Sequence, residues 1–290
     1  MANQIWTIGA ILKWTGQYFG TRGIESPRLD AEVLLSHVLG KARIYLYVHF
    51  DEPLEAAELA QYREYIRQRV ARQPVAYIIG QREFMGLTFK VTPAVLVPQP
   101  DTEVLVQAAL DRLQATPTAR VADIGTGSGA IVLSLLYYMK QLRAAAVDIS
   151  PAALKVAAAN AAALGVADRA TFYEGDLLAP LAGETFMAIV SNPPYIPTAD
   201  IAGLAPEVRS AEPMGALDGG ADGLAFYRRL VAEAPSLLLP GGFLAVEVGV
   251  HEAQPVAEMA AAQTVYSRTE ILKDLAGIDR VVVLWKKTAV

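Results

Sequence analysis

The chain has 290 residues, of which 53% are hydrophobic and 19% charged, so it can build a buried core and is not expected to be disordered. It contains no uninterrupted run of about 18 apolar residues, which argues against a membrane-spanning helix. The net charge of −5 lowers the expectation of a nucleic-acid partner, and the absence of cysteine excludes disulfides and thiolate metal sites.

The first eighty residues predict helices. Ser26 and Pro27 form a helix start signal, and Gly40 stands where a glycine cap would end that helix. Apolar residues recur between them at helical spacing, namely Ala31, Leu34, Leu35, Val38 and Leu39. Residues 1–20 lack the basic-then-apolar order of a signal peptide, which together with the missing cysteines favours the cytoplasm.

A second helix is expected after Pro53, with one apolar face formed by Leu59, Tyr62, Ile66 and Val70. Four arginines lie on its other parts: Arg63, Arg67, Arg69 and Arg72. They form either a solvated face paired with Glu58 and Glu64 or a docking surface for a partner.

Residues 81–97 change pattern and predict a β-hairpin, and after Pro100 strands and helices alternate to the end. Six strands are expected, at Arg120–Ile124, Ala144–Val147, Ala170–Tyr173, Met187–Ser191, Phe243–Val248 and Arg280–Trp285. This alternation is typical of a mostly parallel sheet that is covered by helices on both faces.

A glycine-rich turn follows the first of these strands. It consists of Gly125, Thr126, Gly127, Ser128 and Gly129, ahead of a helix that begins near Ala130. Glycines permit a tight turn and a close approach of a ligand to the main chain. The turn also satisfies the permissive dinucleotide pattern, so it indicates an adenosine-bearing cofactor without choosing its class.

Three carboxylates accompany this turn. Asp148 ends the second strand and can accept hydrogen bonds from ribose hydroxyls of either cofactor class. Asp123, just before the turn, suits a cationic ligand such as S-adenosylmethionine better than a pyrophosphate. Asp176, after the third strand, is either a contact for the adenine amine or an ordinary turn carboxylate.

The fourth strand leads into Asn192-Pro193-Pro194-Tyr195 at the same edge of the sheet. Two successive prolines fix two φ angles and make the loop rigid. The Asn192 side-chain oxygen and the Pro193 carbonyl can accept both N–H bonds of a planar amide or amine, and Tyr195 can pack against its plane. A delocalised nitrogen is a poor nucleophile, so this arrangement favours methyl transfer to it. No strong base or metal is required, and no metal site is expected because the histidines, at 37, 49 and 251, have no ligand spacing.

Together these residues resemble the release-factor glutamine N5-methyltransferases of the HemK/PrmC type. Besides the glycine turn and the Asn-Pro-Pro-Tyr loop, the matching stretches are 72–80, 84–89, 97–103, 212–213, 216–224 and 274–280. The loop alone is shared by many amino-group methyltransferases, whereas the combination in this order is specific. Gln99 departs from the family pattern, which has arginine there.

The resemblance implies a class I methyltransferase fold, an α/β fold with a seven-stranded, mostly parallel sheet. It implies a helical substrate-docking domain over residues 1–80, a β-hairpin linker over 81–98 and the methyltransferase domain over 99–290. The protein substrate would be a class 1 peptide chain release factor, methylated on the glutamine of its Gly-Gly-Gln motif, and we expect a monomer.

Carried over residue by residue, the family's cofactor site would comprise Asp123, Gly125–Gly129, Asp148, Asp176, Leu177 and Asn192. The catalytic and substrate-binding loop would be Asn192, Pro193, Pro194 and Tyr195, with Phe84 as a wall of the glutamine pocket. Three alternatives remain open: methylation of a ribosomal-protein glutamine or of adenine, a non-catalytic factor-binding protein, and a dehydrogenase. Adenine in a duplex would require base flipping and a basic channel, neither of which the charge supports.

Overall fold

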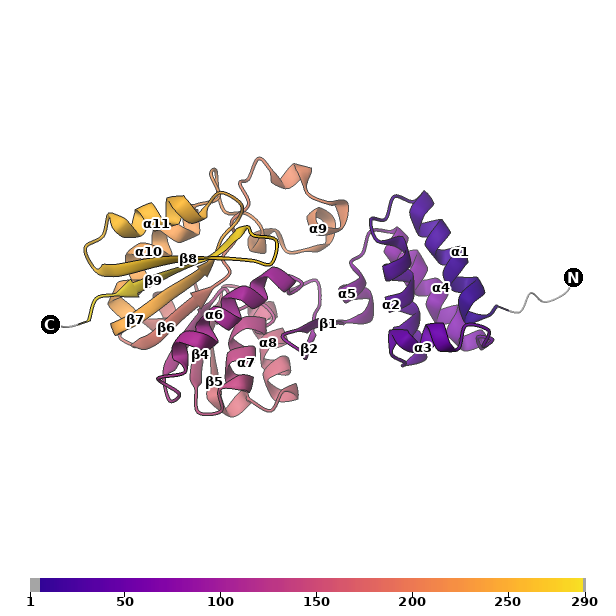
Figure 1. Ribbon diagram of the computed structural model, residues 1–290, viewed down its shortest axis with the longest axis horizontal. Helices are drawn as coiled ribbons and strands as arrows, with labels where there is room; N and C mark the ends of the chain where they lie inside the picture. The colour runs from indigo at the N-terminus through magenta and orange to yellow at the C-terminus, as the bar shows by residue number, and fades with distance from the viewer. Residues whose placement is uncertain (1–5, 289–290) are drawn as a thin grey trace, which may run out of the picture. The chain divides into compact units, whose positions relative to one another are not determined.

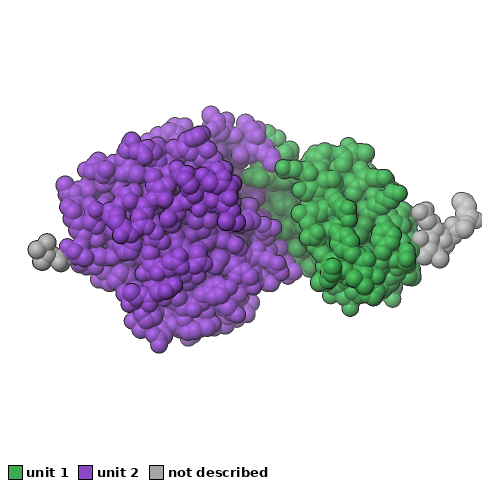
Figure 2. Space-filling view, viewed as in Figure 1, with its two compact units in different colours: residues 1–80, 206–211 green, residues 81–205, 212–290 purple. Residues whose placement is uncertain are grey.

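The structure is a computed structural model that describes residues 6–288 (Figure 1). The first five and last two residues of the predicted domains therefore lie outside the described part. The chain divides into two compact units, one formed by residues 1–80 and 206–211 and the other by 81–205 and 212–290 (Figure 2). None of the helices within residues 6–288 is long and apolar enough to cross a membrane.

The first unit is helical. Its helices are α1 (Ile8–Thr21), α2 (Pro27–Leu39), α3 (Arg43–Val48), α4 (Ala56–Val70), α5 (Val75–Ile79) and α9 (Pro206–Ala211). The predicted boundaries of α2 are confirmed, since it begins at Pro27 and ends at Gly40, whose φ of 60° suits the left-handed cap. Ser26 makes no side-chain capping hydrogen bond, so the proline carries the start signal.

The arginines of α4 differ in their surroundings. Arg67 is exposed and pairs with Glu64, as expected for a solvated face. Arg69 is 5% exposed and donates to Asp30 and Glu207 at 2.7 Å each, so the prediction of a solvated position is wrong for this residue. Two carboxylates surround one buried guanidinium there and compensate its loss of hydration.

The second unit opens with an antiparallel hairpin of β1 (Gln81–Phe84) and β2 (Leu87–Lys90). Met85 and Gly86 connect the strands with φ values of 51° and 67°, which is the backbone of a tight two-residue hairpin turn. The hairpin is shorter than predicted. After Lys90 the chain runs irregularly to the short 3₁₀ turn η1 (Pro100–Thr102).

The large sheet has seven strands in the order β5-β4-β3-β6-β7-β9-β8. They are β3 (Arg120–Ile124), β4 (Arg143–Asp148), β5 (Ala170–Glu174), β6 (Phe186–Ser191), β7 (Leu238–Glu247), β8 (Tyr266–Lys273) and β9 (Asp279–Lys286). The first five in spatial order run parallel, and β9 and β8 close the sheet in antiparallel fashion. All six predicted strands are present, with small differences at their ends.

Helices cover both faces of this sheet (Figure 1). They are α6 (Glu103–Leu113), α7 (Ala130–Tyr138), α8 (Pro151–Ala163), α10 (Ala225–Leu237) and α11 (Ala253–Ala261). Neighbouring strand residues face opposite layers: Val121 packs in the core with α6 and α7, and Ala122 packs in the core with α10 and α11. The predicted three-layer α/β architecture is confirmed.

Candidate active site

The glycine turn joins β3 to α7, as predicted. Gly125, Gly127 and Gly129 have φ values of 72°, 54° and 81°, a backbone region that favours glycine. The amides of Gly125 and Thr126 both donate to the carbonyl of Val147 on β4, at 2.9 and 3.0 Å. The turn is therefore fixed against the neighbouring strand, with its main chain open on the other side.

A buried asparagine, which the sequence reasoning missed, also holds this turn. Asn160 on α8 donates to the carbonyl of Ser128 at 2.9 Å. The same side chain accepts from the amide of Lys90 at 2.8 Å and donates to its carbonyl at 3.0 Å. Asn160 thus ties the end of the hairpin to the turn, at a position where an alanine-rich helix gave no periodic signal.

A cavity of about 380 Å³ opens at the carboxyl edge of the sheet, a size typical of small-molecule sites. Of the predicted site residues, nine line it: Gly125, Thr126, Gly127, Ser128, Asp148, Asp176, Leu177, Asn192 and Pro194. Thr102, Pro213 and Phe226 are among its further lining residues. The structure therefore brings the glycine turn and the Asn-Pro-Pro-Tyr loop together around one space.

Asp148 is held in a fixed orientation at the end of β4. Its two oxygens accept from the amide of Gly127 at 2.8 Å and from the amide of Ser150 at 2.9 Å. Each carboxylate oxygen retains a second lone pair. Asp148 can therefore accept ligand hydroxyls while it braces the glycine turn.

Asp176 follows the neighbouring strand β5, also lines the cavity and makes a two-point contact with Arg229 of α10, at 3.0 and 2.8 Å. The hydrogen bonds from Arg229 hold the pKa of Asp176 below its usual range. The carboxylate is ionised and oriented. To make the predicted contact, it would have to accept a hydrogen bond from the adenine amine in addition to those from Arg229.

Five predicted site residues do not line the cavity: Phe84, Asp123, Gly129, Pro193 and Tyr195, of which Tyr195 lines a separate pocket. Asp123 is fully buried and accepts from the Thr126 hydroxyl at 2.7 Å, and burial raises its pKa to about 7. Thr126 therefore stands between Asp123 and the space in which the predicted cationic ligand would lie. Phe84 is 2% exposed and packs edge-on against Phe89, because alternate residues of the hairpin face the core.

The Asn-Pro-Pro-Tyr loop is held by a glycine-rich segment on its outer side. Ile196 and Gly219 form two backbone hydrogen bonds around the loop, from Ile196 to Leu217 at 3.0 Å and from Gly219 to Ile196 at 2.8 Å. A Cβ on Gly219 would lie 2.7 Å from the Tyr195 backbone, and one on Gly223 would lie 2.4 Å from the Tyr195 carbonyl oxygen. The segment requires glycine here because the loop backbone comes so close.

Asn192 contacts residues outside its own loop. Its side-chain nitrogen donates to the Thr102 hydroxyl at 3.2 Å, and Thr102 also lines the cavity. Gln99, at the position where the family has arginine, donates to the carbonyl of Val97 at 2.9 Å and lines the same cavity. Gln99 thus places an uncharged side chain in the cavity wall at the position where the family has a cationic arginine.

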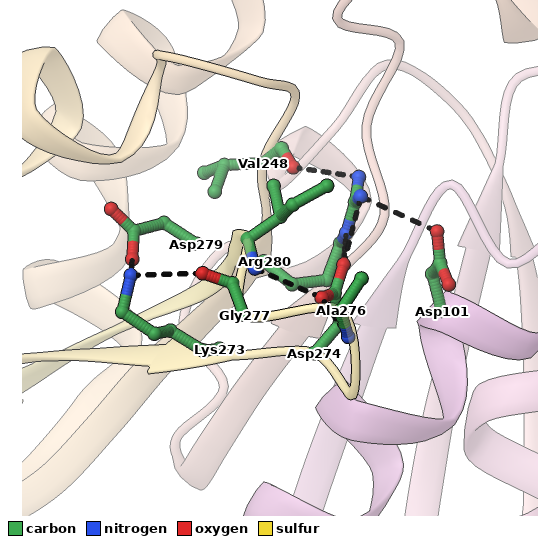
Figure 3. Close-up of polar contacts among 9 residues, drawn as sticks. Asp101, Val248, Lys273, Asp274, Ala276, Gly277, Asp279 and Arg280 are labelled. Carbon is green, nitrogen blue, oxygen red and sulfur yellow. Dashed lines mark hydrogen bonds and ion pairs between the residues drawn. The ribbon is translucent and has the colours of Figure 1, made fainter.

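Two charged residues that the sequence reasoning missed lie behind Asn192. Glu247, the last residue of β7, is 2% exposed, and burial raises its pKa to about 7 although Thr102 and Arg280 lower it. Arg280 pairs with Asp101 at 3.3 Å and with Asp274 at 3.1 Å, as Figure 3 shows. A single acid in the apolar run Leu244–Val248 was the signal that could have drawn attention to Glu247.

The doubly wound sheet, the glycine turn beneath a cavity and the rigid Asn-Pro-Pro-Tyr loop at the same edge define this protein as a class I methyltransferase. Within residues 6–288 no cluster of three or more histidine, aspartate or glutamate side chains could hold a metal ion.

Comparison with known proteins gives the family. Residues 10–80 match the PrmC N-terminal domain, and residues 100–205 match the methyltransferase small domain. A release factor glutamine methyltransferase of Geobacter sulfurreducens is 48% identical over 96% of each chain, and one of Moorella thermoacetica is 49% identical over 91% of this chain and 93% of its own. The chain belongs to the release factor glutamine methyltransferase family.

A solved structure supports the fold alone. A methyltransferase from Pyrococcus furiosus superimposes with a TM-score of 0.50 at 18% identity, covering 79% of this chain and 98% of its own.

Proposed function

We propose that this protein transfers the methyl group of S-adenosyl-L-methionine to the side-chain amide nitrogen of the glutamine in the Gly-Gly-Gln motif of peptide chain release factors. The observation that carries the proposal is the family relationship, which extends over 96% of the chain and includes both units. The intact Asn192–Tyr195 loop, of which Asn192 and Pro194 line the cavity, supports an acceptor with a planar amide.

The residues around the cavity fit S-adenosylmethionine. The glycine turn leaves room for a ligand beside the main chain, and Asp148 presents oriented carboxylate lone pairs at the end of β4. Asp176 and Leu177 lie where the wall of the cavity continues beyond β5. The cofactor, when bound, supplies an already activated methyl group on its sulfonium.

In the proposed reaction the protein orients the acceptor. Asn192 Oδ1 and the Pro193 carbonyl accept the two amide hydrogens of the substrate glutamine, which directs the nitrogen lone pair toward the methyl group. The same acceptors favour the positive charge that develops on nitrogen. As the new N–C bond forms the methyl–sulfur bond breaks, and the methylated nitrogen then releases one of its two protons to solvent. Orientation of this kind contributes on the order of 7–11 kcal/mol to lowering a barrier, so no general base of unusual strength is needed.

We also propose that the helical unit docks the protein substrate, because recognition of a folded protein needs more surface than a glutamine pocket offers. Exposed apolar side chains concentrate on α3 and the turn after it: Ile44, Tyr47, Val48 and Phe50. Such a patch is typical of a protein-interaction site. It is a better candidate than the α4 arginines, of which Arg67 and Arg69 already have partners within this unit.

The test is incubation of the purified protein with methyl-labelled S-adenosylmethionine and a bacterial release factor. The same factor with its Gly-Gly-Gln glutamine changed to alanine serves as the control acceptor. Label in the first and none in the second supports the proposal. Cofactor binding without label in either would contradict the proposed substrate and direct the search to ribosomal proteins and then to nucleic acid.

A further inference from the structure

Thr102, Asn192 and Glu247 come from three separate segments and meet at the cavity wall, which Thr102 and Asn192 line and Glu247 does not. Asn192 follows β6, and Glu247 ends β7, the strand that pairs with β6 up to Ser191 and Val246. Thr102 ends η1. Thr102 and Glu247 are 4% and 2% exposed, so solvent does not compete for their hydrogen bonds.

Hydrogen bonding among the three residues has a direction. The Asn192 side-chain nitrogen donates to Thr102 Oγ1 at 3.2 Å. A hydroxyl that accepts in this way still has one hydrogen to donate. Glu247 follows Val246, which pairs with Ser191, so its carboxyl group lies next to this pair of residues, and its interactions with Thr102 and Asn192 lower its pKa. When ionised, the Glu247 carboxylate can only accept hydrogen bonds, so the donor hydrogens of this series of side chains point toward it.

Glu247 is not accounted for by a structural role. Its Oε2 atom has no hydrogen-bond partner among the described residues, and a buried carboxylate without full compensation is unfavourable. The cation next to it is engaged elsewhere, since Arg280 bonds the carboxylates of Asp101 and Asp274 and the carbonyl of Val248 (Figure 3). A residue that served packing alone would be better replaced by an apolar or amide side chain.

We propose that Glu247 is a positioning residue, which acts through Thr102 to hold the amide nitrogen of Asn192 away from the substrate so that Oδ1 faces the acceptor amide. The inference rests on the proposed function, because it concerns how an amide acceptor is oriented. If the side-chain amide of Asn192 were rotated by 180°, its NH₂ group would face the NH₂ group of the substrate amide, and donor would meet donor. Only the orientation in which Asn192 Oδ1 faces the substrate amide allows the substrate hydrogen bond, and an ionised Glu247, which can only accept, favours that orientation.

The charge of Glu247 responds to several neighbours. Burial raises its pKa to about 7; Thr102, Arg280 of β9 and Asn192 lower it, whereas Asp101 of η1 raises it. Two phenols, Tyr195 of the loop and Tyr227 of α10, interact with this carboxyl group, and each of them also interacts with Glu252. Glu247 is therefore ionised above about pH 7 and protonated below it, and we expect kcat to rise as the pH increases through this region.

The first test is Glu247→Gln in the full chain, with a release factor as substrate. Glutamine can donate as well as accept, so it no longer fixes the direction of the hydrogen bonds. We expect kcat to fall roughly 10- to 100-fold, as for a misplaced catalytic contact, with an unchanged KM for the release factor. The rise of kcat with pH near 7 should disappear. Glu212→Gln is the matched control, because burial also raises the pKa of the half-buried Glu212 to about 7 but the interaction that lowers this pKa is with the Val97 backbone, and this variant should keep the rise.

The second test separates the hydroxyl from the side-chain volume at position 102. Thr102→Ser keeps the hydroxyl and should retain most of the activity, whereas the nearly isosteric Thr102→Val should lose as much kcat as Glu247→Gln. The double variant Thr102→Val with Glu247→Gln should lose no more kcat than either single variant, because both changes interrupt the same series of interactions. Thermal unfolding of each variant shows whether it is folded.

A third measurement needs no activity. Removal of the Thr102 hydroxyl takes away a hydrogen bond that lowers the pKa of Glu247, so a carboxyl ¹³C titration should show this pKa raised in Thr102→Val. An unchanged pKa there, or a wild-type kcat in folded Glu247→Gln or Thr102→Val, would overturn the inference. Absence of release-factor methylation by the wild-type protein would overturn the proposed function instead.

Discussion

Buried carboxyl groups give the sheet unit an unusual acid–base character at the level of single residues. Burial raises the pKa values of Asp123, Glu212 and Glu247 to about 7. Between about pH 4.5 and 7 the folded protein therefore holds protons that the unfolded chain releases. Stability is fully present below this window and is lost as the pH rises through 7.

Glu247→Gln should consequently stabilise the protein at pH 8, where the wild-type residue must bury a charge, and have little effect near pH 4, below this window, where the glutamic acid is largely neutral in both the folded and the unfolded protein. Differential scanning calorimetry at the two pH values measures this. Together with a fall in kcat, the higher Tm would show stability traded for function at this residue. A Tm at pH 8 that equals or falls below the wild-type value would contradict the burial argument.

Asn192 carries the proposed chemistry, and Asn192→Ala removes one polar contact to the reacting amide. We expect a loss of kcat on the order of 10²-fold or more, with an unchanged dissociation constant for S-adenosylmethionine. Steady-state methylation and calorimetric titration measure the two quantities. Weaker cofactor binding with an unchanged kcat would assign Asn192 to the cofactor instead.

At the level of secondary structure, the sequence predicted what periodicity and turn chemistry determine. The strands β3, β4, β6, β7 and β9 are mostly buried and were visible as apolar runs, and β5, an edge strand with exposed and half-buried residues, was found from its place in the alternation. The strand that was not predicted, β8, lies at the sheet edge, and most of its residues are exposed or half-buried. Charged side chains such as Arg268 and Glu270 therefore interrupt the apolar pattern that marks the other strands. Likewise, no spacing rule shows that Arg69 lies between Asp30 and Glu207, because those partners are far apart in sequence.

Arg69→Met tests the importance of this buried cluster. It leaves two carboxylates without their cation and should lower the stability of the helical unit by roughly 3 kcal/mol, whereas Arg67→Met, at an exposed pair, should change it by less than about 1 kcal/mol. Hydrogen exchange resolved by segment measures both, since a chain with two units need not unfold in one step. Equal effects of the two changes would refute the difference in burial.

The exposed patch on α3 has its own test. Ile44→Asp and Val48→Asp change side chains that are 69% and 72% exposed, so folding should be unaffected. If this surface docks the release factor, KM for the factor should rise several-fold while kcat at saturation stays the same. Leu275→Asp, at an exposed position in the β8–β9 connection, is the matched control. An unchanged KM in both α3 variants would remove this surface from the account.

At the level of the whole molecule, the family resemblance and the fold agree, yet the site depends on contacts that no motif contains. The glycine turn and the Asn192 loop were found as short motifs. Glu247 and Asn160 were not, and Thr102 stood in a matching stretch without an assigned role, because each acts through partners that the fold alone brings together. The chain also leaves the sheet unit after residue 205, contributes α9 to the helical unit and returns at 212.

The central claim is the identity of the acceptor atom, and one measurement tests it most directly. A release factor methylated by this protein is digested, and tandem mass spectrometry locates the added methyl group. We expect the methyl group on the side-chain nitrogen of the Gly-Gly-Gln glutamine when the wild-type protein is used, and a strongly reduced amount of it with Asn192→Ala. A methyl group on any other residue, or a modified glutamine that forms equally well without Asn192, would contradict it.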